Sequence, residues 1–265
     1  MLKTRTGGFP IGFRRGGTEW QKEIGALIQW AKANDLACID LGKDADVAGK
    51  AVIGPRLRIG SVDLPNNKGM ISPDKATREA AVAENSRLIE KLAALGAINY
   101  FLVMLPEKPE LPRAENFGYM VESFRQLAPV LEGSQARLVV EGWPGPGALC
   151  CTPENYRAFF EQIPSKAMGM NYDPSHLVRM GIDYLRFLRE FGERVYHVHG
   201  KDTELLSENQ YEYGYEQPAT FAKPIWFGGF AWRYTIPGHG QVRWVEIMRQ
   251  LQALNYSGCV SIELE

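Results

Sequence analysis

Short apolar segments alternate with longer amphipathic segments along almost the whole chain, and this rhythm restricts the possible fold more than any other feature. Parallel strands need crossover connections of about a dozen residues or more, which are usually helical. The alternation therefore predicts parallel β-strands joined by helices. The chain has 265 residues, close to the ~250 residues of a single eightfold barrel. We predict an α/β fold, one (β/α)8 TIM-barrel domain over residues 1–265.

The apolar segments are the predicted strands. They are 36–41, 56–64, 98–105, 137–141, 168–173, 195–199 and 258–263, and a first strand near 5–13 is interrupted by glycines. Helices are predicted over 18–34, 73–95, 114–131, 183–191 and 244–254, with another starting at Pro153. Thr18 and Thr152 are expected to cap their helices, and Gly96 to end one.

Residues 201–243 form the one long stretch without such periodicity. Aromatic residues and glycines are frequent there, including the run Trp226-Phe227-Gly228-Gly229-Phe230. Long loops in compact domains are usually functional. We interpret 201–243 as a loop insertion over the site, although a surface excursion packed by its own aromatics is an equal alternative.

Charge and hydropathy exclude some partners. The net charge is −1, with 30 Lys and Arg against 31 Asp and Glu, which disfavours a nucleic acid or an anionic membrane as the main partner. No apolar run approaches the ~20 residues of a membrane helix, and the N-terminus lacks the apolar core of a signal peptide. We expect a protein that is soluble and stays in the cytoplasm.

The four cysteines agree with a reducing compartment. Cys38 and Cys259 lie in apolar segments and are expected to be buried free thiols. Cys150 and Cys151 are adjacent and cannot form an ordinary disulfide with each other. A cytoplasmic location suits this pattern.

Four predicted strands end on a side chain that can bind a metal. These residues are Glu141, Asp173, His199 and Glu263. The carboxyl ends of barrel strands meet at one face, where active sites lie. Three carboxylates and one imidazole suit Mn²⁺, Co²⁺, Mg²⁺ or Zn²⁺ and leave positions open for a substrate. The sequence therefore predicts one divalent metal ion at this face.

Residues next to the predicted ligands have chemistry suited to a substrate. His176 follows Asp173 by three positions and is expected to reach a substrate hydroxyl or to cap a turn. Lys201 and Asp202 follow His199. Lys201 is a candidate for neutralising a substrate oxyanion and Asp202 for orienting an imidazole, or the two pair with each other. His197 is expected to be a hydrogen-bonded core residue.

Four motifs stand out in the second half of the chain: NYDPSHL, HVHGKD, the turn IPGHG followed by a tryptophan, and LNYSGCVSIELE. They resemble motifs of the sugar isomerase/epimerase group of xylose-isomerase-like TIM barrels. The resemblance implies that the same four residues bind the metal and that His176 contacts the substrate. It also implies that Glu141 and Glu263 act as catalytic acid and base.

The chain departs from that pattern in three places. GWPGPG follows Glu141, where ketose 3-epimerases carry a second substrate-binding glutamate. Thr235 stands where an arginine often precedes the IPG turn, with Arg233 two residues earlier. The sequence also ends two residues after Glu263, so the last barrel helix is expected to be missing or truncated.

These observations predict a divalent-metal-dependent isomerase or epimerase that moves a proton on a ketose or related polyol through an enediolate. Trp143, Trp226 and Trp232 are candidates for stacking on the sugar, and Lys201 and Arg233 for binding an anionic group. The resemblance also suggests a homo-oligomer.

Two alternatives keep this barrel. One is a metal-dependent sugar or inositol-type dehydratase that uses the same site, and the other is a non-catalytic sugar-binding barrel. A multi-zinc phosphodiesterase is disfavoured because the chain has only 4 His. A dehydrogenase is disfavoured because no G-x-G-x-x-G follows an early strand.

Overall fold

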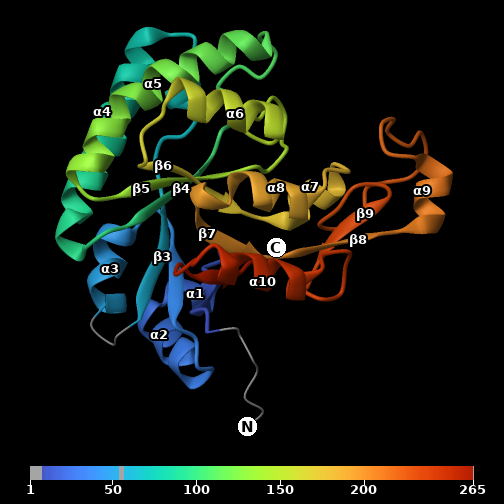
Figure 1. The fold of residues 1–265 in the computed structure, drawn as a ribbon, viewed down its shortest axis with the longest axis horizontal. Coiled ribbons are helices and arrows are strands. Elements are labelled where there is room, and N and C mark those ends of the chain that lie inside the picture. The colour runs from blue at the N-terminus through green and yellow to red at the C-terminus, as the bar shows by residue number, and fades with distance from the viewer. Residues whose placement is uncertain (1–7, 54–56, 265) are drawn as a thin grey trace.

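Eight parallel strands close into a barrel, as the sequence predicts (Figure 1). The structure is a computed structural model and describes residues 8–53 and 57–264. Around the barrel the order is β1-β10-β7-β6-β5-β4-β3-β2, and β1 closes it by pairing with both β10 and β2. The strands are β1 (Ile11–Arg14), β2 (Cys38–Leu41), β3 (Arg58–Asp63), β4 (Asn99–Val103), β5 (Arg137–Glu141), β6 (Met168–Tyr172), β7 (Val195–Gly200) and β10 (Val260–Ile262).

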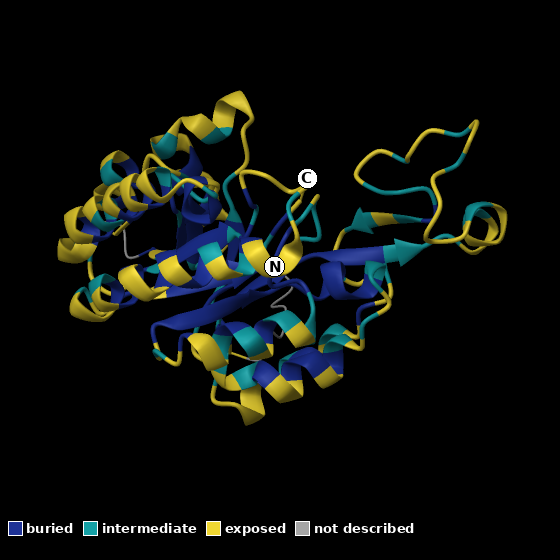
Figure 2. Cartoon of the chain, turned by 90° about the horizontal axis from the view of Figure 1, so that it is seen from above, coloured by how far each residue is buried: buried dark blue, intermediate teal, exposed yellow. Residues whose placement is uncertain are grey.

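Helices connect the strands and cover the outside of the barrel. They are α1 (Glu19–Lys22), α2 (Ile24–Ala33), α3 (Ala45–Ile53), α4 (Lys75–Leu92), α5 (Arg113–Gly133), α6 (Pro153–Gln162), α7 (Pro174–Arg179), α8 (Tyr184–Phe191) and α10 (Trp244–Ala253). Short 3₁₀ turns occur at Gly69–Ile71, Ala93–Leu95 and Gly192–Arg194. Figure 2 shows that the strands are buried while the helices expose their outer faces. No helix among the described residues is both long and apolar enough to cross a bilayer.

The predicted helix ends are partly right. The Thr152 hydroxyl accepts a hydrogen bond from the Asn155 amide at the start of α6, as expected. Thr18 makes no side-chain cap, and the predicted helix over 18–34 is divided at Glu23 into α1 and α2. Gly96 ends the 3₁₀ turn after α4 with a φ of 102°, a backbone conformation that favours glycine.

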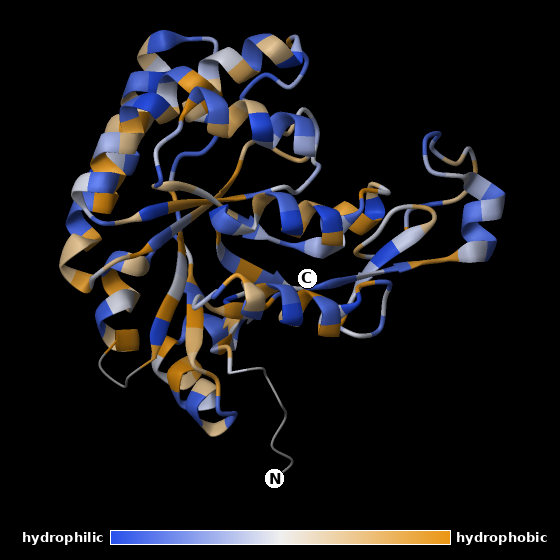
Figure 3. Cartoon of the chain, in the orientation of Figure 1, coloured by the Kyte–Doolittle hydropathy of each residue, from blue (hydrophilic) through white to orange (hydrophobic). Residues whose placement is uncertain are grey.

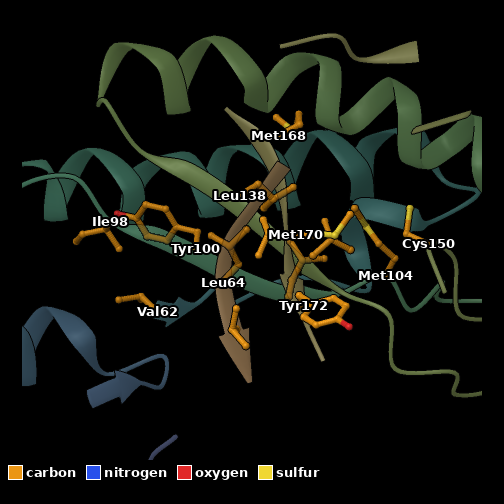
Figure 4. Close-up of a cluster of buried hydrophobic side chains, with 14 of the residues drawn as sticks. Val62, Leu64, Ile98, Tyr100, Met104, Leu138, Cys150, Met168, Met170 and Tyr172 are labelled. Carbon is orange, nitrogen blue, oxygen red and sulfur yellow. The ribbon is translucent and has the colours of Figure 1, made fainter. Parts of the chain in front are cut away.

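The main core lies between the strands and the helices. Figure 4 shows Leu138 of β5 with Met168 and Met170 of β6 in this layer, and Figure 3 shows the hydrophobic residues gathered on the strands and on the helix surfaces that face them. Because successive side chains of a strand point to opposite faces, burial of Leu138 and Val140 in this core places Glu141 on the inner face of the barrel. The packing of β5 therefore aims a carboxylate into the barrel.

Residues 201–243 are more regular than the sequence suggested. β8 (Asp202–Leu205) pairs antiparallel with β9 (Trp232–Thr235), and α9 (Ser207–Tyr213) follows β8. We call residues 202–235 the arm, because Figures 1 and 2 show it projecting from the barrel beyond β7. The expectation of an irregular loop is wrong at the base of the arm, where the two strands pair.

The prediction of free thiols at Cys38 and Cys259 is also wrong, because the two residues form a disulfide. Cys38 begins β2 and Cys259 precedes β10, and these strands lie on either side of β1. A Cβ at Gly12 of β1 would lie 2.8 Å from the Cys38 Sγ, so the glycine leaves room for the bridge. Barrel closure brings together cysteines that are 221 residues apart in the sequence. Cys150 and Cys151 are free and buried.

Candidate metal centre

Four ligand-type side chains converge at the carboxyl ends of β5, β6, β7 and β10. Glu141, Asp173, His199 and Glu263 are all buried, and one ligand atom from each lies within 4.8 Å of the others. The His199 Nδ1 atom is 2.7 Å from the Glu141 Oε1 and 3.3 Å from the Glu263 Oε2. The structure therefore brings together the four residues that the sequence singled out as metal ligands.

The electrostatics of this cluster depend on its cations. Burial by itself would raise the pKa of both glutamates. The charge of His199 and hydrogen bonds from His199 and His176 together lower the pKa of Glu141 well below its usual value. The charges of His199 and Lys201, with a hydrogen bond from His199, lower the pKa of Glu263 to about 2. Burial likewise opposes the charged form of His199, yet Glu263 and Glu141 raise the pKa of His199 well above its ordinary value. The carboxylates are thus ionised and require a positive charge beside them.

One ligand oxygen is placed where a cation can bind. Asp173 caps α7 through its Oδ1, which accepts from the Ser175 amide at 2.8 Å. Its Oδ2 is buried without a hydrogen bond among the described residues, 3.3 Å from the Lys201 Nζ and 3.3 Å from the His176 Nε2. A buried anionic oxygen of this kind is costly unless it is paired or binds a metal. The four side chains fit a divalent ion with oxygen and one nitrogen ligand.

Lys201 lies at the same cluster. Its Nζ is 2.5 Å from the Glu263 Oε2, and its side chain is buried. The Nζ also lies 4.6 Å from the centre of the Tyr234 ring. Lys201 therefore supplies positive charge next to the carboxylate of Glu263.

Asp40, which no sequence pattern singled out, lies behind His199. Its Oδ2 is 2.9 Å from the His197 Nε2 and 3.3 Å from the His199 Nε2, and its Oδ1 accepts from the Ser261 hydroxyl at 3.0 Å. Asp40, His197 and His199 form a second group with metal-ligand spacing. His197 is a hydrogen-bonded core residue as predicted. A side chain on Gly60 would overlap the Asp40 carboxylate, so glycine makes space for Asp40 in the barrel.

Arg14, which no sequence pattern singled out either, contacts the oxygen of Glu263 that faces away from His199 and Lys201. The Arg14 Nε lies 3.1 Å from the Glu263 Oε1, and the Arg14 guanidinium donates to both oxygens of Asp63 at 3.0 and 3.2 Å. Arg14 also stacks 4.3 Å from the centre of the Phe101 ring. This planar, charged contact orients one oxygen of Glu263 and leaves the other facing His199.

His176 lies on α7. Its Nδ1 is 2.7 Å from the Tyr234 hydroxyl, which also accepts from the Arg179 Nη1 at 2.7 Å. Trp232 covers Arg179, with the guanidinium 4.4 Å from the centre of its ring. Tyr234 and Arg179 were not predicted, because neither ends a strand.

A cleft of about 510 Å³ opens from the cluster toward the arm. Lys201 and Glu263 form its inner wall, and Trp226 and Arg233 its outer wall. Arg233 is ion-paired with Glu204 at 2.6 Å.

Two other predicted site residues lie apart from the cleft lining. Asp202 accepts hydrogen bonds from the backbone amides of Thr203, Gly238 and Val242, so it organises the turn after the arm. We expected Asp202 to orient an imidazole, but Asp40 occupies that position. Trp143 is half-buried in the loop after β5.

Comparison with known proteins agrees with this architecture. The family model described as "Xylose isomerase-like TIM barrel" matches residues 28–265. The YfiH protein of Bacillus subtilis (strain 168) is 35% identical over 100 residues, which are 37% of this chain and 31% of YfiH. Inosose dehydratase of Geobacillus thermodenitrificans (strain NG80-2) is 26% identical over 151 residues, 57% of this chain and 48% of that enzyme. The alignments thus cover half or less of these relatives.

Solved structures share the fold at low sequence identity. E. coli 3-keto-D-glucoside 4-epimerase superposes with a TM-score of 0.70 at 15% identity, over 97% of this chain and 91% of that one. A D-psicose 3-epimerase structure gives 0.72 at 16%, over 97% and 85%. Mannonate dehydratase from Streptococcus suis gives 0.73 at 10%, over 95% and 82%.

Proposed function

The chain belongs to the xylose isomerase-like TIM-barrel family, and from this premise we propose that it is a divalent-metal-dependent isomerase or epimerase of a ketose or related polyol. The observation that supports the proposal most is the convergence of Glu141, Asp173, His199 and Glu263 within 4.8 Å. A divalent ion held there would polarise a substrate carbonyl and stabilise the charge of an enediolate.

The two glutamates are the proposed proton carriers. Glu141 ends β5 and Glu263 directly follows β10, with β6 and β7 between these strands, so the two carboxylates reach the centre from different sides. Asn171 donates to the Glu141 Oε1 at 2.8 Å, and Arg14 contacts the Glu263 Oε1. With one oxygen of each oriented, one glutamate can remove a proton from the substrate and the other can return it.

Lys201 and the cleft are the proposed substrate-binding elements. Lys201 carries a buried positive charge next to Glu263, where it can stabilise a developing oxyanion. Arg233 at the cleft wall can bind an anionic group, and the exposed ring of Trp226 can stack on a sugar. Trp143 and Trp232 do not line the cleft, so their proposed stacking on the sugar has less support than that of Trp226.

The test combines metal removal with paired substitutions. Treatment with a chelator should abolish turnover of ketoses, and Mn²⁺ or Co²⁺ should restore it. Glu141→Gln and Glu263→Gln should each lower kcat by at least ~100-fold, because each removes a proton carrier. The exposed Glu107→Gln is the control and should retain activity. Full turnover by metal-free protein, or by both site variants, would contradict the proposal.

Dehydration at the same site is the second candidate, favoured by the similarity to inosose dehydratases. Both reactions begin with removal of a proton next to a carbonyl, and dehydration then expels a hydroxyl group. Product mass separates them: in ordinary water an isomer keeps the mass of the substrate, whereas a dehydration product is lighter by one water. In heavy water the isomer also gains deuterium at the exchanged carbon.

A further inference from the structure

The outer part of the cleft is lined mainly by apolar side chains. Five of them, which we call the apolar wall, come from the arm and from the residues just after β9 and β10: Ile225, Trp226, Phe227, Ile236 and Leu264. We propose that this wall binds the aglycone of a glycoside, as a flat, uncharged ring linked to a sugar whose ketone lies at the ligand cluster. The wall thus names a substrate class for the proposed function, and the part played by the ketone rests on that function.

The cleft is larger than a single sugar requires. Its volume is about 510 Å³. Liquid water takes up about 30 Å³ per molecule, so this volume exceeds the space of a hexose, whose roughly 12 carbon and oxygen atoms are bonded and lie closer together. A sugar bound beside Lys201 and Glu263 therefore leaves space for a further ring between itself and the apolar wall.

The apolar wall leaves large hydrophobic groups in contact with water. Trp226 is 80% exposed, Leu264 59%, Ile236 55% and Phe227 43%. Single exposed hydrophobic side chains are common in soluble proteins, but several around one cleft are typical of a ligand-binding groove. An apolar ring would remove this surface from water, so the hydrophobic effect favours a ligand of this kind.

The turn that carries Trp226 and Phe227 is ordered by its backbone. The Tyr234 amide of β9 donates to the Phe227 carbonyl at 2.9 Å, and Phe227 has a φ of 55°, in the left-handed region. A Cβ at Gly228 would overlap the backbone of β9, so the turn packs directly on this strand. The rings of Trp226 and Phe227 lie 5.2 Å apart, edge to face. Two aromatic rings held in this way lose little entropy when a ligand binds.

The linkage between sugar and ring follows from the position of the wall. In a glycoside the anomeric carbon is bonded to the aglycone oxygen and has no carbonyl, so the ketone is on another ring carbon. The cleft is continuous from Glu263 to Trp226, so the ketone and the aglycone can occupy its two ends. Arg233 also borders the outer part and is ion-paired with Glu204 at 2.6 Å. A phenyl-type ring suits this wall better than a second sugar, whose hydroxyls would lose hydrogen bonds to water against apolar groups.

Calorimetric titration of the whole protein in the presence of Mn²⁺ tests the proposal. The ligands are the methyl and phenyl glycosides of one hexose with a ketone on its ring. The phenyl compound should bind at least about tenfold more tightly, because its ring adds aromatic and hydrophobic contact, and Trp226→Ala should remove most of this preference. Phe221→Ala is the matched control and should keep the preference, since Phe221 is a 98% exposed residue of the arm outside the cleft lining.

Two results of the titration would overturn the proposal. One is equal affinity for the two glycosides, whether the apolar wall stays in contact with water or is covered by a second copy of the chain. The other is tighter binding of a disaccharide of the same keto-sugar than of the phenyl glycoside.

Turnover of the same compounds separates the aglycone site from the proposed function. The phenyl glycoside should have the higher kcat/KM, and Trp226→Ala should narrow the difference. A phenyl preference in binding without turnover of either glycoside would contradict the proposed function for this substrate class and support the aglycone site. Turnover of both with equal kcat/KM and equal affinity would support the proposed function and overturn the aglycone site.

Discussion

Replacing Asp40 with asparagine tests how the barrel prepares His199 for a metal ion. In the native protein the Asp40 Oδ2 lies 3.3 Å from the His199 Nε2 and favours a proton on that nitrogen. When the ring loses one of its two protons to bind a metal ion, Nδ1, which is 2.7 Å from Glu141, then offers its lone pair toward the other ligands. In Asp40→Asn the amide can donate to Nε2 instead, which moves the ring proton to Nδ1 and blocks the metal ligand. The substitution keeps the volume of the side chain, but it removes the negative charge and changes the hydrogen bonding.

The size of the effect can be bounded. Loss of a partner that orients a metal-binding histidine typically weakens binding by about 10- to 100-fold, which is about 1.4–2.8 kcal/mol. We expect the upper half of this range, because Asp40 is only 1% exposed and water cannot replace it. Competition between the protein and a fluorescent chelator for Mn²⁺ at fixed pH and ionic strength measures the change.

Asp46→Asn is the matched control for this experiment. Asp46 pairs with Lys91 at 2.6 Å on the outside of the barrel and should not influence Mn²⁺ affinity. Thermal unfolding of the metal-free variants shows whether Asp40→Asn still folds. Native Mn²⁺ affinity in a folded Asp40→Asn protein would refute the role of Asp40.

Two further predictions concern pH and the disulfide. His199 must lose a proton to bind a metal ion, and its pKa is raised well above 6.5 in the metal-free protein, so metal affinity should rise by about tenfold from pH 5.5 to 6.5. Glu263, with a pKa of about 2, stays ionised in this range; a flat affinity profile would contradict the assignment of His199. Reduction of the disulfide between Cys38 and Cys259, which are 221 positions apart in the sequence, should lower the free energy of unfolding by about 2–5 kcal/mol. Equal urea midpoints with and without reductant would show that the bridge does not stabilise the barrel.

The barrel and the ligand cluster were the parts that the sequence could reveal. Each proposed ligand ends an apolar segment, and the geometry of parallel barrels brings strand ends to one face. Glu141 is an example: five residues, Arg137–Glu141, give both the strand and its acidic end. Local sequence was sufficient because the barrel itself supplies the convergence.

The residues around the ligands were harder to find. Asp40 lies inside an apolar strand, and only closure of the barrel places it behind His199. Arg14 follows a glycine-interrupted segment, and its partners Asp63 and Glu263 are distant in the sequence. Tyr234 belongs to the arm, whose two strands are separated by 26 residues (206–231), so no local pattern indicated that they pair. Contacts of this kind depend on tertiary structure rather than on local periodicity.

Anomalous diffraction from crystals grown with Mn²⁺ tests the central claim most directly, because it locates the ion independently of activity. We expect one strong peak per chain, in contact with Glu141, Asp173, Glu263 and the Nδ1 atom of His199. Absence of a peak at this cluster, or a peak only among Asp40, His197 and the Nε2 atom of His199, would contradict the proposed metal centre.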